Sequence, residues 1–253
     1  MTVKATEIFF EIHKDLPREG PGSFGATKKA YDSICPSLKE PLILDIGCGP
    51  GKQTHDLLKI TDGKIIAVDN HKPFIDRLNN NIRSHGFEDR ASAQLGDMFN
   101  LQFKEDMFDL IWSEGAIYQI GFEKGLREFK KFLKPNGFMA VTEVSWVIEK
   151  ISSDAADFWA QEYPAMKSVE ENLEIVKNCG YEIVNHFILD KSDWFNDYYT
   201  PMKPRLEMIK EKYSDDETAK EVIRMHELEI EILELYYEEY GYVFYILHNK
   251  NNE

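Results

Sequence analysis

From Pro41 onward, short apolar runs alternate with segments in which apolar residues recur every three or four positions. The runs have the length of buried strands, and the segments between them have the period of helices that bury one face. The predicted strands cover residues 42–46, 63–69, 91–97 and 108–114, and within residues 133–146 a turn at Pro135-Asn136-Gly137 leads into a fifth strand. This alternation is typical of an α/β fold, in which a mostly parallel sheet has helices on both faces.

Two further helices are expected before this core, at residues 3–16 and 24–35. In the first, apolar residues stand at helical spacing, and Pro36 stops the second. The stretch between them is rich in glycine and proline, so it is expected to be a loop. Residues 1–40 are therefore expected to form an N-terminal helical cap.

The chain beyond the core contains two more predicted strands, at residues 181–190 and 240–249. Ser168 and Glu171 form a capping box that opens the helix before the first of these strands, and this helix is expected to end at Gly180. The sequence predicts one domain over residues 1–253, with a cofactor-binding core at 41–150 and a helical insertion or lid at 190–240. In that insertion, Ser214 and Glu217 are expected to form a second capping box, and the acidic residues of the long helix that follows are expected to face water.

A glycine-rich turn, "LDIGCGPGKQT" at residues 44–54, directly follows the first predicted strand. A turn of this kind exposes bare backbone at the carboxyl edge of a parallel sheet, where ligands bind in doubly wound folds. A P-loop would need four residues between its first glycine and Gly-Lys, but Gly47 and Gly51 enclose three. The dinucleotide pattern would need Gly or Ala at position 52, which is lysine.

The remaining pattern, Asp45 with Gly47, Gly49 and Gly51, resembles motif I of the class I S-adenosylmethionine-dependent methyltransferases. The resemblance extends to Asp69 after the second strand, to Gly96-Asp97-Met98 after the third, and to "LKPNGF" before the fifth. It covers residues 41–144 and implies a Rossmann-like, seven-stranded, mostly parallel sheet of order 3-2-1-4-5-7-6, whose last strand is antiparallel. The chain is also similar to the ubiquinone/menaquinone-type branch of the family, although nothing in the sequence identifies a quinone.

The resemblance implies S-adenosylmethionine as the cofactor. Asp69 is expected to bind the ribose hydroxyls, with a helix N-cap as its alternative role, and Asn70 to contact the ribose or the adenine. Asp97 is expected to accept from the adenine amino group while Met98 packs on the ring. Gly47 and Gly49 would face the methionine portion, Asp45 would hold its ammonium directly or through water, and Arg18 would either grip its carboxylate or lie on the surface.

The substrate is less constrained, because methyl transfer from a sulfonium needs positioning and dehydration more than any obligatory catalytic group. The segment after the fourth strand, residues 113–118, lacks the Asn/Asp-Pro-Pro-aromatic motif of base amino-methyltransferases. Cytosine C5 methyltransferases need a nucleophilic cysteine near the fourth or fifth strand, and none of the three cysteines lies there. The expected acceptor is a small molecule. The candidate catalytic residues are Glu114, Tyr118 and Glu143, and Glu114 is also a candidate for contact with the sulfonium.

Composition narrows the function classes further. The formal net charge is -15, with 45 acidic against 30 basic residues, so nucleic acid is not expected as a partner. The N-terminus has charges within every short apolar stretch, which predicts no signal peptide, no membrane span and a cytoplasmic protein. The three cysteines and seven histidines show no metal-ligand spacing, so no metal site is expected.

Two alternatives to a methyltransferase stay open at this point. One is a nicotinamide-dependent oxidoreductase, and the other is a regulatory protein that binds S-adenosylmethionine without catalysis. The sequence also leaves open whether the chain forms a homodimer.

Overall fold

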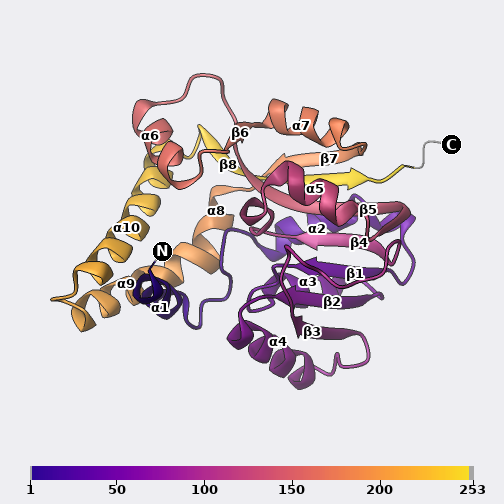
Figure 1. The fold of residues 1–253 in the computed structure, drawn as a ribbon, viewed down its shortest axis with the longest axis horizontal. Coiled ribbons are helices and arrows are strands. Elements are labelled where there is room, and N and C mark those ends of the chain that lie inside the picture. The colour runs from indigo at the N-terminus through magenta and orange to yellow at the C-terminus, as the bar shows by residue number, and fades with distance from the viewer. Residues whose placement is uncertain (1, 251–253) are drawn as a thin grey trace.

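One mixed sheet organises the protein, whose computed structural model describes residues 2–250 (Figure 1). The strand order is β3-β2-β1-β4-β5-β8-β7, with β8 antiparallel to both of its neighbours. Because β7 and β8 are the sixth and seventh predicted strands, the expected order and the antiparallel last strand are confirmed. The strands are β1 (Leu42–Ile46), β2 (Lys64–Asp69), β3 (Ala91–Leu95), β4 (Phe108–Ser113), β5 (Leu133–Trp146), β7 (Glu182–Ile188), β8 (Tyr240–His248) and the unpredicted two-residue β6 (Lys167–Ser168), which pairs with β5.

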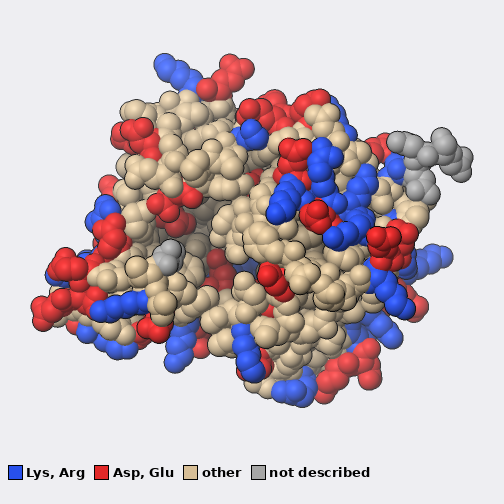
Figure 2. All heavy atoms as spheres, in the orientation of Figure 1, with Lys and Arg blue, Asp and Glu red and all other residues tan. Residues whose placement is uncertain are grey.

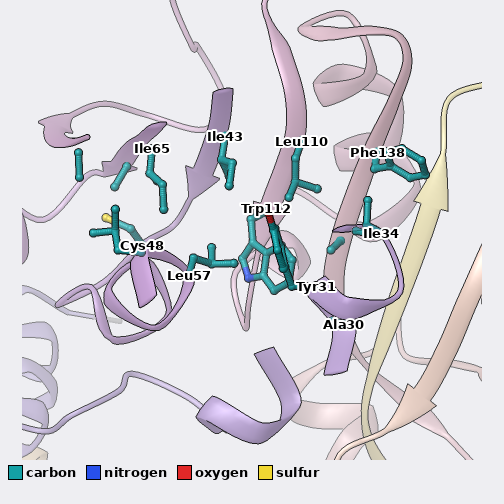
Figure 3. Packing of buried hydrophobic residues seen from close by; sticks show 14 of the residues in the cluster. Ala30, Tyr31, Ile34, Ile43, Cys48, Leu57, Ile65, Leu110, Trp112 and Phe138 are labelled. Carbon is teal, nitrogen blue, oxygen red and sulfur yellow. The ribbon is translucent and has the colours of Figure 1, made fainter. Parts of the chain in front are cut away.

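Two hydrophobic layers cover the faces of this sheet. One face packs against α2 (Phe24–Asp32), α3 (Lys52–Ile60) and α4 (Lys72–Ser84), and the other against α5 (Phe122–Lys130) and α7 (Val169–Asn178). Figure 3 shows Ile43, Leu110 and Trp112 of the sheet directed toward the helices of the first layer. Burial of these apolar side chains on both faces is the main favourable term that holds the core together.

A third hydrophobic cluster joins the N-terminal helix to the segment between β7 and β8. In Figure 1 these helices gather at one end of the sheet, beside α1 and the N-terminus. The cluster is formed by α1 (Val3–His13), α6 (Ser153–Glu162), α8 (Lys191–Trp194), a π-helical turn (Phe195–Tyr199), α9 (Thr200–Lys212) and α10 (Glu217–Tyr236). The expected insertion and α1 therefore form one helical lobe, to which α6, a helix that the sequence did not predict, also contributes. The second helix of the expected N-terminal cap, α2, covers the sheet instead.

Helix capping follows the prediction at α7 and departs from it at α10. The capping box of Ser168 and Glu171 is present. The predicted box of Ser214 and Glu217 is wrong, because α10 begins at Glu217 and its N-cap is Asp216. The carboxylate of Asp216 accepts from the backbone N–H groups of residues 218 and 219 at 3.0 and 3.2 Å, which satisfies donors that Ser214 lies too far upstream to reach.

The acidic residues of α10 do not all face water, which corrects a further expectation. Glu229 lies on the inner side of the helix, where its carboxylate accepts a hydrogen bond of 2.6 Å from the hydroxyl of Tyr199. Burial raises the pKa of Glu229 above its usual value. The helical lobe is therefore packed partly through polar groups.

Candidate functional site

The glycine loop between β1 and α3 has the backbone conformation that its residues predict. Gly47 has φ +71°, and a Cβ there would lie 2.3 Å from the Cβ of Ala116. Gly51 has φ +91°, forms the N-cap of α3, and would place a Cβ 2.2 Å from the side chain of Leu78 on α4. Any side chain at these two positions would strain the backbone and overlap a neighbour.

Asp69, at the end of β2, holds this loop from the side. Its Oδ2 accepts from the backbone N–H of Gly49 at 2.9 Å, and its Oδ1 accepts from that of His71 at 2.8 Å. The N-cap of α4 is His71, so the alternative role of Asp69 as that cap is wrong. The carboxylate is thus fixed by two backbone donors at the carboxyl edge of the sheet.

A pocket of about 270 Å³ opens over the loop and the ends of β1, β2 and β4. Phe9 and Phe10 of α1 form one wall of the pocket, and the segment from Arg18 to Pro21 forms another. Eight of the residues predicted for the site line it, namely Arg18, Gly47, Gly49, Asp69, Asn70, Met98, Glu114 and Tyr118. Four do not, namely Asp45, Gly51, Asp97 and Glu143.

Asp45 and Asp97 lie outside the pocket for different reasons. The side chain of Asp45 is fully buried beneath the loop, where its Oδ2 accepts a hydrogen bond of 2.5 Å from Thr54 and its Oδ1 has no hydrogen-bond partner among the described residues. Burial raises the pKa of Asp45 to about 7. Asp97 is exposed, and its Oδ1 accepts from the backbone N–H of Phe99 at 2.9 Å.

Arg18 is not a surface residue, which corrects that alternative. It is 3% exposed, and its guanidinium binds Glu114 at 2.8 Å and Asp56 at 3.2 Å. Glu114 also accepts from the Thr27 hydroxyl and from the Trp112 indole N–H, each at 2.8 Å. With three donors already directed at it, this carboxylate is suited to hold Arg18 in place rather than to remove a proton.

Glu143 lies behind the Tyr118 side of the pocket. It is 2% exposed, its Oε1 accepts a 2.6 Å hydrogen bond from the Tyr163 hydroxyl, and its Oε2 is buried without a partner among the described residues. Burial raises the pKa of Glu143 to about 8. The rings of Tyr118 and Tyr163 meet edge to face with their centres 5.9 Å apart, so these two tyrosines connect the pocket to the acid.

Sequence reasoning missed several residues that line the pocket, among them the acidic Glu19 and the aromatic Phe9, Phe10 and Phe74. Glu19 lines the pocket beside Arg18, and it bonds to His13, which is buried at the end of α1. Phe9 belongs to the apolar face that predicted the helix at residues 3–16, and Phe10 stands next to it outside that face; nothing in the pattern distinguishes a pocket wall from ordinary core. Glu19 stands in a stretch recognised only as a loop, and no local signal pairs it with His13.

Among residues 2–250, no helix is both long and apolar enough to cross a bilayer. Within the same range, no group of three or more His, Cys, Asp or Glu side chains is arranged to hold a metal ion.

Comparison with known families places the chain in context. The model of a family described as "Methyltransferase domain" matches residues 39–225. Sterol 24-C-methyltransferase erg6 of Aspergillus fumigatus is 26% identical over 178 residues, which is 64% of this chain and 46% of that protein. The chain spans about half the length of the curated relatives it matches.

Solved structures share the fold at low sequence identity. A S-adenosylmethionine-dependent methyltransferase from Geobacter sulfurreducens, in complex with S-adenosyl-L-homocysteine, has a TM-score of 0.80 and 19% identity, covering 95% of this chain and 97% of that one. The [4+2]-cyclase SpnF has a TM-score of 0.76 and 16% identity, covering 97% of this chain and 92% of that one. The fold by itself therefore occurs in proteins named for different reactions.

Proposed function

The chain belongs to the class I S-adenosylmethionine-dependent methyltransferases, and on that premise we propose that it transfers the methyl group of S-adenosylmethionine to a small-molecule acceptor. The observation that carries this proposal is the charge of the pocket around the bare glycine loop. Among its described lining residues, Arg18 alone is a lysine or arginine, and two carboxylates already neutralise it. Asp69 adds a carboxylate and Glu19 a carboxyl group that can ionise, so the pocket suits a cationic sulfonium with an ammonium far better than a diphosphate.

The fit extends to the parts of the cofactor. Asp69, held by two backbone donors, would accept from the ribose hydroxyls, and Asn70 stands next to it. Met98 lines the pocket where the adenine is expected, and Gly47 lines it at the expected methionine end, where the absence of a side chain lets the loop pack against Ala116. Asp45 and Gly51 would act from beneath, by supporting the loop. Asp97, exposed outside the pocket wall, would reach the adenine only if its loop turned inward.

When bound, the cofactor supplies a methyl group on a sulfonium, which leaves as a neutral thioether. The protein would then need to orient the acceptor, exclude water and receive any proton that the acceptor loses. Tyr118 lines the pocket, and Tyr163 connects it to Glu143. Glu143 has a pKa near neutrality and a free buried oxygen, properties that suit a general base in its ionised form.

A small acceptor is also supported by the distribution of surface charge and by the relatives, which include sterol 24-C-methyltransferases. Figure 2 shows basic side chains interspersed with acidic ones on the visible face, rather than gathered in one positive area that would follow a nucleic-acid backbone. It also shows acidic side chains in the hollow between the core and the helical lobe. We further propose that the protein acts in the cytoplasm and that the helical lobe, rather than a partner subunit, covers the acceptor.

Two measurements test this function. Calorimetric titration with S-adenosylmethionine, S-adenosylhomocysteine and NADH is expected to show binding of the first two alone; binding of NADH alone would support the oxidoreductase alternative and overturn the proposal. Incubation of the protein with methyl-labelled S-adenosylmethionine and a small-metabolite extract is expected to transfer label. Cofactor binding without any transfer, across extracts, would favour the regulatory alternative.

A further inference from the structure

Glu19 occupies an unusual position between the pocket and α1. Its Oε2 lies 2.8 Å from Nδ1 of His13, while its Oε1 is buried without a hydrogen-bond partner among the described residues. Its Cγ is 3.3 Å from the point where a Cβ on Gly49 would stand, so the side chain lies directly against the glycine loop. Glu19 therefore lines the pocket at the end expected to hold the methionine portion, with one carboxyl oxygen bonded to His13 and the other enclosed without a partner among the described residues.

The hydrogen-bond chain behind Glu19 determines where the protons are. Nδ1 of His226 lies 2.7 Å from the carbonyl oxygen of Val222, and a carbonyl oxygen only accepts, so Nδ1 carries a proton. A neutral His226 then has a bare Nε2, and Nε2 of His13, 3.2 Å away, must donate to it. Nδ1 of His13 is consequently bare, which leaves Glu19 as the donor across the 2.8 Å contact.

This proton assignment requires Glu19 to be a neutral acid while both histidines are uncharged. Burial supports it from each side, because it raises the pKa of Glu19 to about 8, lowers that of His13 to about 3 and lowers that of His226. Charged or titratable groups of neighbouring elements also act on these three residues. Asp69 raises the pKa of Glu19, whereas Arg77 and His71 lower it. Arg205 lowers the pKa of His13, and Glu229 raises that of His226.

From this arrangement we propose that Glu19 is the site for the amino group of the cofactor, and that it exchanges its own proton for that ammonium. The inference rests on the proposed function, since it needs a ligand that carries an ammonium. On binding, the O–H bond at Oε2 breaks and the proton passes to solvent; the carboxylate left behind gives up its contact with the bare Nδ1 of His13 and pairs with the ammonium. His13 does not keep the proton, because an imidazolium that is 1% exposed, close to Arg205, would be strongly disfavoured.

Glu19 therefore contributes to binding only after it ionises, which makes cofactor affinity pH-dependent. Below the pKa of Glu19, each molecule bound releases close to one proton, so the dissociation constant falls about tenfold for each unit that the pH rises. Above pH 8 the dependence disappears, since Glu19 is already ionised in the free protein.

The test is calorimetric titration of the full chain with S-adenosylhomocysteine at pH 7, in two buffers whose ionisation enthalpies differ. The wild type is expected to release close to one proton per ligand. Glu19→Gln should release none. Above pH 8, where the wild type is already ionised, this variant should bind about ten- to a hundredfold more weakly than the wild type, since hydrogen bonds to charged groups contribute roughly 1.5–3 kcal/mol; at pH 7 the difference should be about tenfold smaller. The Gln amide can still donate to His13, so this variant preserves the neutral hydrogen-bond chain and its fold.

Two controls isolate the ammonium. 5′-Methylthioadenosine, which lacks the amino acid portion, should bind wild type and Glu19→Gln equally and release no proton. Glu7→Gln, an exposed position on the same helix as His13, should behave as the wild type does. Normal binding of S-adenosylhomocysteine without proton release, or with unchanged affinity in Glu19→Gln above pH 8, would overturn the inference while leaving the proposed function intact. Failure of every adenosine ligand to bind would overturn both.

Discussion

Replacement of Arg18 by methionine tests the buried ion cluster on which the pocket wall depends. The change keeps most of the apolar stem but removes the guanidinium, and leaves the Glu114 and Asp56 carboxylates, which are 3% and 0% exposed, facing each other without it. Breaking a buried pair from one side costs about 3–5 kcal/mol. Here the lower end is expected, because Lys52 still binds Asp56 at 2.5 Å and Glu114 keeps two neutral donors.

We therefore expect Arg18→Met to lower the free energy of unfolding by about 3 kcal/mol, or the melting temperature by roughly 6–12 °C. Urea unfolding followed by tryptophan fluorescence and circular dichroism measures the change. Adding Glu114→Gln to Arg18→Met should recover part of the loss, because the amide removes one uncompensated charge and keeps an acceptor for Trp112 and Thr27.

A matched arginine on the surface provides the control. Arg127 pairs with Glu123 one turn away on the exposed face of α5, so Arg127→Met should leave the unfolding midpoint unchanged. If Arg18→Met lowered the free energy of unfolding by less than about 1 kcal/mol, or by no more than Arg127→Met does, the buried cluster would stabilise the fold no more than a surface ion pair. That result would refute the argument from burial.

Three other changes have defined outcomes. Asp69→Asn should weaken binding of S-adenosylhomocysteine about ten- to a hundredfold by calorimetry, because it removes the charge that serves the ribose hydroxyls. Gly51→Ala should lower stability to urea by about 1–3 kcal/mol, since its φ is +91° and the added methyl overlaps Leu78. Glu143→Gln should flatten the pH dependence of stability. The raised pKa of Glu143 stabilises the fold below about pH 4.5, and this contribution disappears at up to about 1.4 kcal/mol per pH unit as the pH rises to about 8.

Each of these three substitutions has its own control or contradicting result. Asp76→Asn, on the exposed face of α4, should leave ligand affinity unchanged, and equal affinities of Asp69→Asn and the wild type would contradict the ribose role. Gly86→Ala has a similar φ of +70° but open space, so it reports backbone strain alone; a loss as large as that of Gly51→Ala would exclude the overlap with Leu78 as a cause. Superimposable pH profiles of wild type and Glu143→Gln would show that Glu143 does not titrate in this window.

The amino-acid sequence by itself determined the order of elements, the glycine loop and the place of Asp69. These features are local: apolar period separates strand from helix, the glycines have positive φ because the tight turn requires it, and Asp69 follows its strand directly. The strand order follows from family resemblance, and capping signals are reliable only when the helix start is known, as Asp216 in place of Ser214 shows.

The tertiary structure alone decided which charged groups meet. Arg18 and Glu114 are 96 positions apart, and His13 and His226 are 213 apart, so no spacing in the chain marks either contact. It also placed Asp45 beneath the loop and Glu143 behind a tyrosine, outside the pocket wall. A side chain's charge and pKa depend on what surrounds it after packing, and these surroundings come from segments far apart in the chain, such as α1 and α10 around His13 and His226, which local pattern does not encode.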